Sequence, residues 1–305
     1  MCGLIGVLYT KEFNGINELV ESLIYEAAIR GTDATGIAYN SGKGLCIDKK
    51  PVSGYKFKTK LPKGAKAVIG HTRHTTQGNQ NKNYNNHPFP GKCGKTKFAL
   101  AHNGVLMNDN ELKNSLPRTK IETDSYVAVQ LLEKSDKLDF KNIKKMAETV
   151  YGSFSFSILD QYNNLYIVKG DSPISILYFD KYGLYVYAST DEILWKGIID
   201  SPLFEELQHG RYGEIKINDG DILKISAKGK LEYDRFDYTS GTFYDWRTYT
   251  SDMYDTFDKD SAEYDNLYYY YLISVAASKG ISSGEIDELI SYGLTYDEIE
   301  DYLYS

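Results

Sequence analysis

Cys2 occupies the position in this sequence that most constrains its chemistry. A cysteine in second place permits removal of the initiator methionine, which would leave a thiol and a free α-amino group on one residue. An α-amine has a pKa of roughly 7.7 to 8.0 and can serve as the general base for that thiol. We therefore expect Cys2 to act as a nucleophile once Met1 is removed, although a lone cysteine near a terminus is more often a small buried side chain.

Three further segments carry side chains suited to amide chemistry. Arg73 follows an apolar run, and its planar guanidinium can grip a carboxylate at two points. Asn103 and Gly104 also follow an apolar run, and a side-chain amide beside a glycine N–H is what an oxyanion hole requires. Asp124 opens a helical pattern, where by itself it would only be a cap. In isolation the arginine would be read as an ion-pair residue and Asn-Gly as a turn, but the four features together favour a catalytic site.

The segments that carry these residues resemble the class II glutamine amidotransferase family. The matching pieces are residues 1–6, 30–36, 71–78, 102–104 and 123–124, in the family's order and spacing, with weaker matches at 171–173 and 188–191. The resemblance extends over about residues 2 to 225. It implies an α+β fold, namely the four-layer αββα sandwich of N-terminal-nucleophile hydrolases.

The resemblance also implies a reaction and a set of roles. Cys2 would attack the side-chain amide of glutamine, giving a thioester and ammonia, and water would then release glutamate. The expected oxyanion and glutamine-binding residues are Asn103 and Gly104 for the oxyanion, Arg73 for the α-carboxylate, Asp124 for the α-ammonium, and Thr76 and Gly78 for the pocket wall. Support of the pocket is expected from Arg30, Gly31, His74, Gln77 and His102. No cofactor is expected.

Two positions depart from the family pattern. Synthase-type relatives usually carry Trp where this chain has His74, and His where it has Gln77, so we expect glutamine affinity and pocket closure to be affected here. Four of the five histidines lie within residues 71–102 together with Cys93, which raises the alternative of a zinc site. We do not favour a metal, because His71 and His74 would point to opposite faces of a strand. Residues 70–78 also lack the spacing of a phosphate-binding loop.

Composition indicates a globular protein without a membrane-spanning run or a signal peptide, and we expect a cytoplasmic location. Three cysteines are too few for a disulfide framework. The net charge of −7 is uneven, since residues 251–305 hold thirteen acidic residues against two lysines. Half of the 28 tyrosines lie from Tyr233 onward. Neither the overall charge nor a basic patch favours direct nucleic-acid binding.

The hydrophobic pattern predicts two sheets with helices outside them. Expected strands cover residues 3–9, 67–71, 98–102, 153–159, 165–168, 174–179 and 184–188, with hairpins at 35–40/45–48 and 213–217/221–225. Expected helices cover 16–30, 124–133 and 140–149, and residues 77–97 read as a long polar loop.

We expect three parts: an amidotransferase-like domain over residues 2–232, an acidic Tyr-rich linker over 233–261, and a small helical module over 262–305. In the last part, Ser282 with Glu285 and Thr295 with Glu298 match the capping-box spacing, and Gly293 sits where a helix would stop. This acidic module could bind another protein, although a solvated helical surface is the simpler reading.

About 80 residues follow the matched region, too few for a large acceptor domain. We therefore expect the ammonia to be used by an acceptor synthase encoded separately. Two alternatives stay open: a free-standing amidase acting on a γ-glutamyl compound, and a non-catalytic interaction protein that retains the fold.

Overall fold

The computed structural model describes residues 2–238 and 281–304, together with Tyr269, Leu272, Ala276 and Lys279. Residues 2–238 form one compact unit, and the described residues beyond 268 belong to a second. The expected linker falls outside the described residues from 239 onward, as does most of residues 262–280. No helix in the described part is long and apolar enough to cross a membrane.

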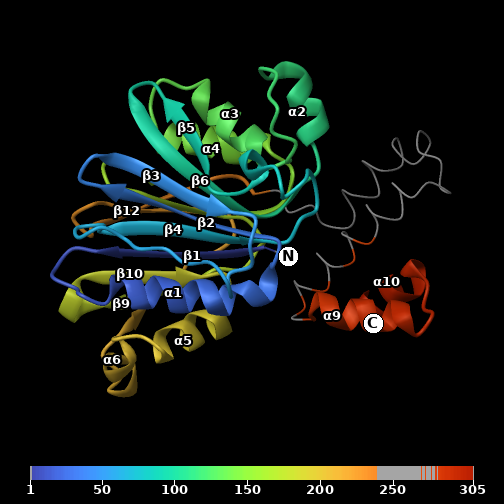
Figure 1. The fold of residues 1–305 in the computed structure, drawn as a ribbon. Coiled ribbons are helices and arrows are strands. Elements are labelled where there is room, and N and C mark those ends of the chain that lie inside the picture. The colour runs from blue at the N-terminus through green and yellow to red at the C-terminus, as the bar shows by residue number, and fades with distance from the viewer. Residues whose placement is uncertain are drawn as a thin grey trace. The chain divides into compact units, whose positions relative to one another are not determined.

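The first unit contains two antiparallel sheets, which confirms the expected α+β class. The seven-stranded sheet has the spatial order β11 (Gly213–Glu214), β9 (Ser175–Phe179), β10 (Leu184–Ala188), β1 (Gly3–Tyr9), β4 (Ala67–Arg73), β2 (Ala34–Ser41) and β3 (Gly44–Lys50). The six-stranded sheet has the order β13 (Leu231–Arg235), β12 (Asp221–Ile225), β8 (Leu165–Lys169), β7 (Gly152–Asp160), β6 (Thr96–Leu106) and β5 (Phe89–Cys93). Figure 1 shows the two sheets stacked, with β1 and β4 central in the first.

Helices cover the outer face of each sheet (Figure 1). The helices α1 (Ile16–Ala27), α5 (Asp191–Ile199) and α6 (Phe204–Gln208) lie on the side of the seven-stranded sheet, and α2 (Asp109–Ser115), α3 (Tyr126–Glu133) and α4 (Phe140–Thr149) on the other. Three separate apolar clusters result: one under α1 and α5, one under α3 and α4, and one between the sheets. Burial of these apolar faces is the main force that holds the layers together.

Three elements differ from the sequence-based expectation. Residues 213–217 and 221–225 do not form a hairpin, because β11 pairs with β9 in one sheet and β12 pairs with β8 and β13 in the other. The polar loop expected over 77–97 contains the edge strand β5, where Pro90 is tolerated because only one side of the strand is paired. Strand β13 carries the first unit beyond the boundary expected at residue 232, as far as Tyr238.

The second unit contains the helices α9 (Ser283–Ser291) and α10 (Tyr296–Tyr304). The expected capping box at Ser282 and Glu285 is present, and Gly293 adopts a φ of +88° just after α9, where glycine is favoured at a helix end. A small apolar core is formed by Leu272, Ala276, Ile286, Ile299 and Leu303.

A row of buried histidines lies where β4, β6 and the segment before β5 meet. The ring of His87 packs against His71, with centroids 4.1 Å apart, and against Phe89 at 4.4 Å. His71 Nε2 lies 2.9 Å from the carbonyl oxygen of His102, so this ring nitrogen carries the proton and bridges the two sheets. Burial lowers the pKa of His71 to about 3 and holds the pKa values of His87 and His102 below the usual range. The three rings are therefore neutral at physiological pH.

We predict that this row makes the fold acid-labile. The folded protein keeps the three rings neutral, whereas the unfolded chain protonates them below about pH 6.5. Proton uptake therefore favours the unfolded state, so the free energy of unfolding is highest above pH 6.5 and falls as the pH falls toward 3. His71, with a pKa of about 3 in the folded protein, should by itself lower the free energy of unfolding by roughly 2 kcal/mol between pH 7.5 and pH 5, and His87 and His102 act in the same direction. Urea titrations at the two pH values measure this loss.

His87→Phe should flatten the pH dependence, because it keeps an aromatic ring beside Phe89 and removes a titrating group. The exposed His209 provides the control, since His209→Asn should leave the pH dependence of the free energy of unfolding unchanged. Equal slopes for both variants would contradict the prediction.

Candidate functional site

Cys2 lies at the start of β1, beside the end of β4. The antiparallel register pairs Gly3 with Thr72, which brings the residue before Gly3 next to Arg73. The half-buried thiol of Cys2 donates to the carbonyl oxygen of His74 at 3.5 Å. Burial raises the pKa of this thiol, and the carboxylate of Asp124 adds to the rise while the guanidinium of Arg73 opposes it. The thiol thus senses both charged side chains that the sequence singled out.

The turn that contains Arg30 and Gly31 packs directly on this end of β4. Arg30 Nε donates to the carbonyl oxygen of Cys2 at 2.8 Å. A Cβ atom on Gly31 would lie 2.3 Å from the carbonyl carbon of Arg73, so only glycine allows this approach. Asp33 continues the contact, since its N–H donates to the Arg73 carbonyl and its carboxylate accepts from Thr75 N. These contacts fix the backbone on both sides of the thiol.

Arg73 is almost completely buried, with 3% of its surface exposed. Its Nη1 donates to Asn86 Oδ1 at 2.7 Å, and its Nη2 donates to the carbonyl oxygen of Gln77. Gln77 therefore contributes through its backbone, while the neighbouring His74 has an exposed side chain and contributes its carbonyl oxygen. At both positions that depart from the family pattern, a main-chain carbonyl oxygen thus contacts Cys2 or Arg73.

The loop after β4 is fastened to Glu122. Gly78 adopts a φ of +73°, and a Cβ there would lie 3.0 Å from Glu122 Cβ. The Glu122 carboxylate accepts from Lys82 Nζ at 2.5 Å and Asn85 Nδ2 at 2.7 Å, and the Lys82 contact is the main reason that its pKa falls to about 2. Thr76 is half-buried in the same loop. This anchoring sets the position of the loop that would form the pocket wall.

Asn103 and Gly104 lie in β6. Asn103 is fully buried, and neither its amide nitrogen nor its amide oxygen has a hydrogen-bond partner within the described residues. Buried amides without partners cost free energy and are rare in native proteins. Gly104 has a φ of +133°, and a Cβ there would lie 1.9 Å from the carbonyl oxygen of Ser153, so the backbone conformation requires glycine. The bridge from His71 to the His102 carbonyl holds this part of β6 close to the Arg73 end of β4.

Asp124 and Thr123 precede α3. The Asp124 carboxylate is 4% exposed and accepts from the N–H of Leu106 at 2.8 Å, at the end of β6. The hydroxyl of Thr123 is buried and has no partner among the described residues. Ser125, which the sequence did not single out, links Asp124 to His102: its Oγ lies 3.3 Å from Asp124 Oδ1 and 2.8 Å from His102 Nδ1.

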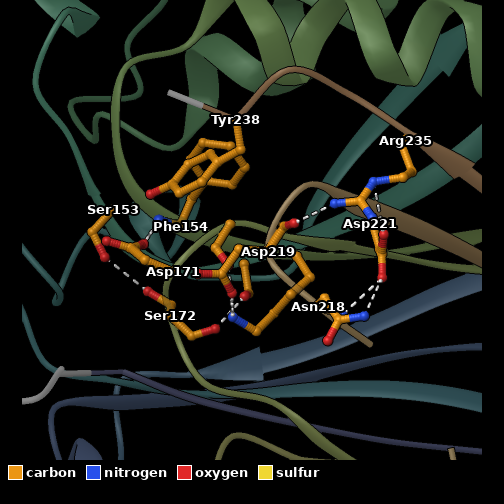
Figure 2. Close-up of polar contacts among 12 residues, drawn as sticks. Ser153, Phe154, Asp171, Ser172, Asn218, Asp219, Asp221, Arg235 and Tyr238 are labelled. Carbon is orange, nitrogen blue, oxygen red and sulfur yellow. Dashed lines mark hydrogen bonds and ion pairs between the residues drawn. The ribbon is translucent and has the colours of Figure 1, made fainter. Parts of the chain in front are cut away.

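β7, the strand that pairs with Asn103 and Gly104, is held by hydrogen bonds from Asp171 and Ser172 (Figure 2). Asp171 Oδ1 accepts from the N–H of Phe154 at 3.0 Å, and Ser153 Oγ lies 2.9 Å from Ser172 Oγ. The ring of Tyr238, the last residue of the unit, packs edge-on against Phe154. Asp171 and Ser172 therefore support β7.

Comparisons with known proteins identify the family. A glutamine amidotransferase domain model matches residues 71–196. The glutamine–fructose-6-phosphate aminotransferase of Listeria innocua is 34% identical over 186 residues, which covers 58% of this chain and 30% of that protein. The 7-cyano-7-deazaguanine synthase 2 of Sulfurisphaera tokodaii is 27% identical over 247 residues, covering 75% and 51% respectively.

Among solved structures, glutamine phosphoribosylpyrophosphate amidotransferase from B. subtilis superposes with a TM-score of 0.61 at 22% identity, over 77% of this chain and 49% of that one. The matched part of this chain thus accounts for 30% of the Listeria aminotransferase and about half of the other two proteins. The family match and the sequence relatives show that this chain carries a class II glutamine amidotransferase domain, related to that of glutamine–fructose-6-phosphate aminotransferase, and the superposition shows that it shares its fold with glutamine phosphoribosylpyrophosphate amidotransferase.

Proposed function

We propose that residues 2–238 hydrolyse the side-chain amide of glutamine, with Cys2 as an N-terminal nucleophile. The observation that carries the proposal is that the register of β1 and β4 sets Cys2 beside the buried Arg73, while the charge of the buried Asp124 also acts on the pKa of the thiol. A zwitterionic amino acid needs one group of each sign at a fixed separation. The thiol of Cys2 would then attack the side-chain amide of the bound amino acid.

The proposed reaction consists of two successive displacements at the amide carbon. The sulfur of Cys2 attacks the amide carbon, the C–N bond breaks, and ammonia leaves with the proton that the thiol gave up. Water then attacks the thioester, which releases glutamate and restores the thiol. Burial raises the pKa of Cys2, so a base is needed at neutral pH. We propose that the α-amine of Cys2 is that base, which requires removal of Met1.

Asn103 and Gly104 are suited to stabilise the oxyanion of the tetrahedral intermediate. The Asn103 amide is buried without a partner in the described part of the chain, so its hydrogen-bonding capacity is available to a ligand. Donors fixed before the reaction starts need no reorganisation when negative charge develops. The buried Thr123 hydroxyl, likewise without a described partner, is suited to a polar group of the bound amino acid.

Arg73 is suited to bind the α-carboxylate. Its contacts with Asn86 and Gln77 use two of the five N–H groups that a guanidinium carries. The remaining donors can meet a carboxylate in the paired geometry that arginine favours. Asp124, held by the N–H of Leu106, would bind the α-ammonium.

The first test is directed at the nucleophile. Intact mass should show that Met1 is absent from the native protein, and the processed protein should release glutamate from glutamine. Cys2→Ala should abolish this release, because the variant lacks the thiol that would form the thioester. Cys46, half-buried on β3, gives the matched control, and Cys46→Ala should retain activity. Retention of Met1 in an active protein, or activity in Cys2→Ala, would rule out the proposed mechanism.

The second test is directed at the oxyanion. Asn103→Ala should lower kcat by roughly 100- to 1,000-fold with little change in KM, because the lost donor acts mainly on the transition state. Steady-state kinetics on glutamine measure the split. Because the Asn103 amide makes no hydrogen bond with the described residues, thermal unfolding of the variant should stay close to that of the parent. A rise in KM at constant kcat would instead assign Asn103 to substrate binding.

We further propose that the ammonia is passed to an acceptor enzyme on a separate chain. The support is that two similar proteins are named as an aminotransferase and an amidotransferase, and both names denote transfer of nitrogen to an acceptor. Such coupling predicts slow glutamine turnover by the isolated chain and acceleration by a partner enriched on the immobilised protein. Fast turnover of a γ-glutamyl peptide by the isolated chain, exceeding that of glutamine, would favour a free-standing amidase.

A further inference from the structure

Asn86 connects Arg73 to the loop that follows β4. This side chain is fully buried, and its Oδ1 accepts from Arg73 Nη1 at 2.7 Å. Its Nδ2 donates to the carbonyl oxygen of Gln80 at 2.8 Å and to Asn83 Oδ1 at 3.1 Å. All polar atoms of the amide are thus engaged, and its orientation is fixed by the loop. A fixed amide oxygen in turn fixes the plane of the guanidinium.

Lys49, on the edge strand β3, is fastened to the same segment by three hydrogen bonds. Its Nζ donates to the carbonyl oxygens of Asn86, at 2.5 Å, and Pro88, at 3.2 Å. Its own carbonyl accepts from Asn83 Nδ2 at 2.7 Å. Gly36, the cross-strand neighbour of Lys49, lets the segment approach β3 because it has no side chain. A Cβ at this position would lie only 2.3 Å from the carbonyl oxygen of His87.

Electrostatics oppose this placement of a lysine. Burial and the nearby Arg73 guanidinium lower the pKa of Lys49 to about 8. Two cations held close together destabilise the fold unless other contacts compensate. The two carbonyl oxygens and the ring of Phe89, 5.0 Å from Nζ, supply that compensation. Since both carbonyls belong to the segment that orients Arg73, this costly arrangement points to a role at the site.

We propose that Lys49 is a positioning residue for glutamine binding, which holds residues 86–88 so that Asn86 presents its amide oxygen to Arg73. The inference rests on the proposed function, because it assigns Arg73 to the substrate carboxylate. Lys49 itself does not touch the substrate. Its loss would let the guanidinium rotate and would weaken binding in the ground state and the transition state alike.

The test compares two adjacent lysines of β3. Lys49→Met should raise KM for glutamine about tenfold and leave kcat within about twofold, which is the pattern of lost uniform binding. Lys50→Met is the matched control, because this substitution removes the same charge from the same strand. The exposed Lys50 also lies over an aromatic ring, that of Phe57. Lys50→Met should leave both constants unchanged. Glutamine affinity measured by calorimetry in the Cys2→Ala background gives the same comparison without catalysis.

A double-mutant cycle with Asn86→Ala separates positioning from a general loss of stability. If Lys49 acts through Asn86, the two effects on glutamine affinity are not additive. Additive effects, an unchanged KM in Lys49→Met, or a fall in kcat at constant KM would overturn the inference. Should Lys49→Met fail to fold, an unchanged affinity in Asn86→Ala would overturn it alone. A parent protein that never releases glutamate would instead refute the proposed function.

Discussion

The antiparallel pairing of β1 with β4 is the constraint on which the rest of the site depends. This register sets Gly3 opposite Thr72 and therefore puts the thiol of Cys2 beside Arg73, although the two residues are far apart in the sequence. A shift of one residue would turn every side chain of β1 to the opposite face of the sheet. Close packing at the glycines of β1 opposes such a shift, since a Cβ on Gly6 would lie 2.3 Å from the ring of Tyr187 and a Cβ on Gly3 would lie 2.5 Å from Thr72 Oγ1.

A second constraint joins the two sheets. The hydrogen bond from His71 to the His102 carbonyl links β4 to β6, so that Asn103 and Gly104 are held in relation to Arg73 rather than to their own sheet alone. Within the described residues, buried polar atoms without hydrogen-bond partners lie at this junction, including both ring nitrogens of His87 and the side-chain amide of Asn103, which follows His102 in β6. The fold thus bears a desolvation cost where a polar ligand could relieve it, as is usual for sites organised before their substrate arrives.

The segment between β4 and β5 acts as a scaffold for the buried guanidinium. Its asparagines hydrogen-bond to one another, to Glu122 and to Lys49, so the loop is ordered by side chains rather than by regular secondary structure. Long polar loops with internal hydrogen bonding commonly carry function. Arg73 thus stands at the end of a strand, while its guanidinium is hydrogen-bonded by the loop that follows.

The sequence by itself determined the local elements and the family. Apolar periodicity located β1, α4 and β10 at their observed bounds, because burial on one or both faces leaves a direct pattern. The ordered motifs resembled those of the amidotransferase family, and the domain model matches residues 71–196, which include Arg73, Asn103 and Asp124. The capping signals of α9 were equally local.

Tertiary structure alone decided which strands pair and which neighbours serve the site. Residues 213–225 read as a hairpin, yet β11 and β12 lie in different sheets, because a strand's partner depends on distant packing that alternation does not encode. The same holds for Ser125, Asn86 and Lys49, whose residue types are common in turns and on surfaces and gave no signal of their own. Their contacts with His102, Arg73 and residue 86 cross loops and sheets, and such contacts exist only once the layers have assembled.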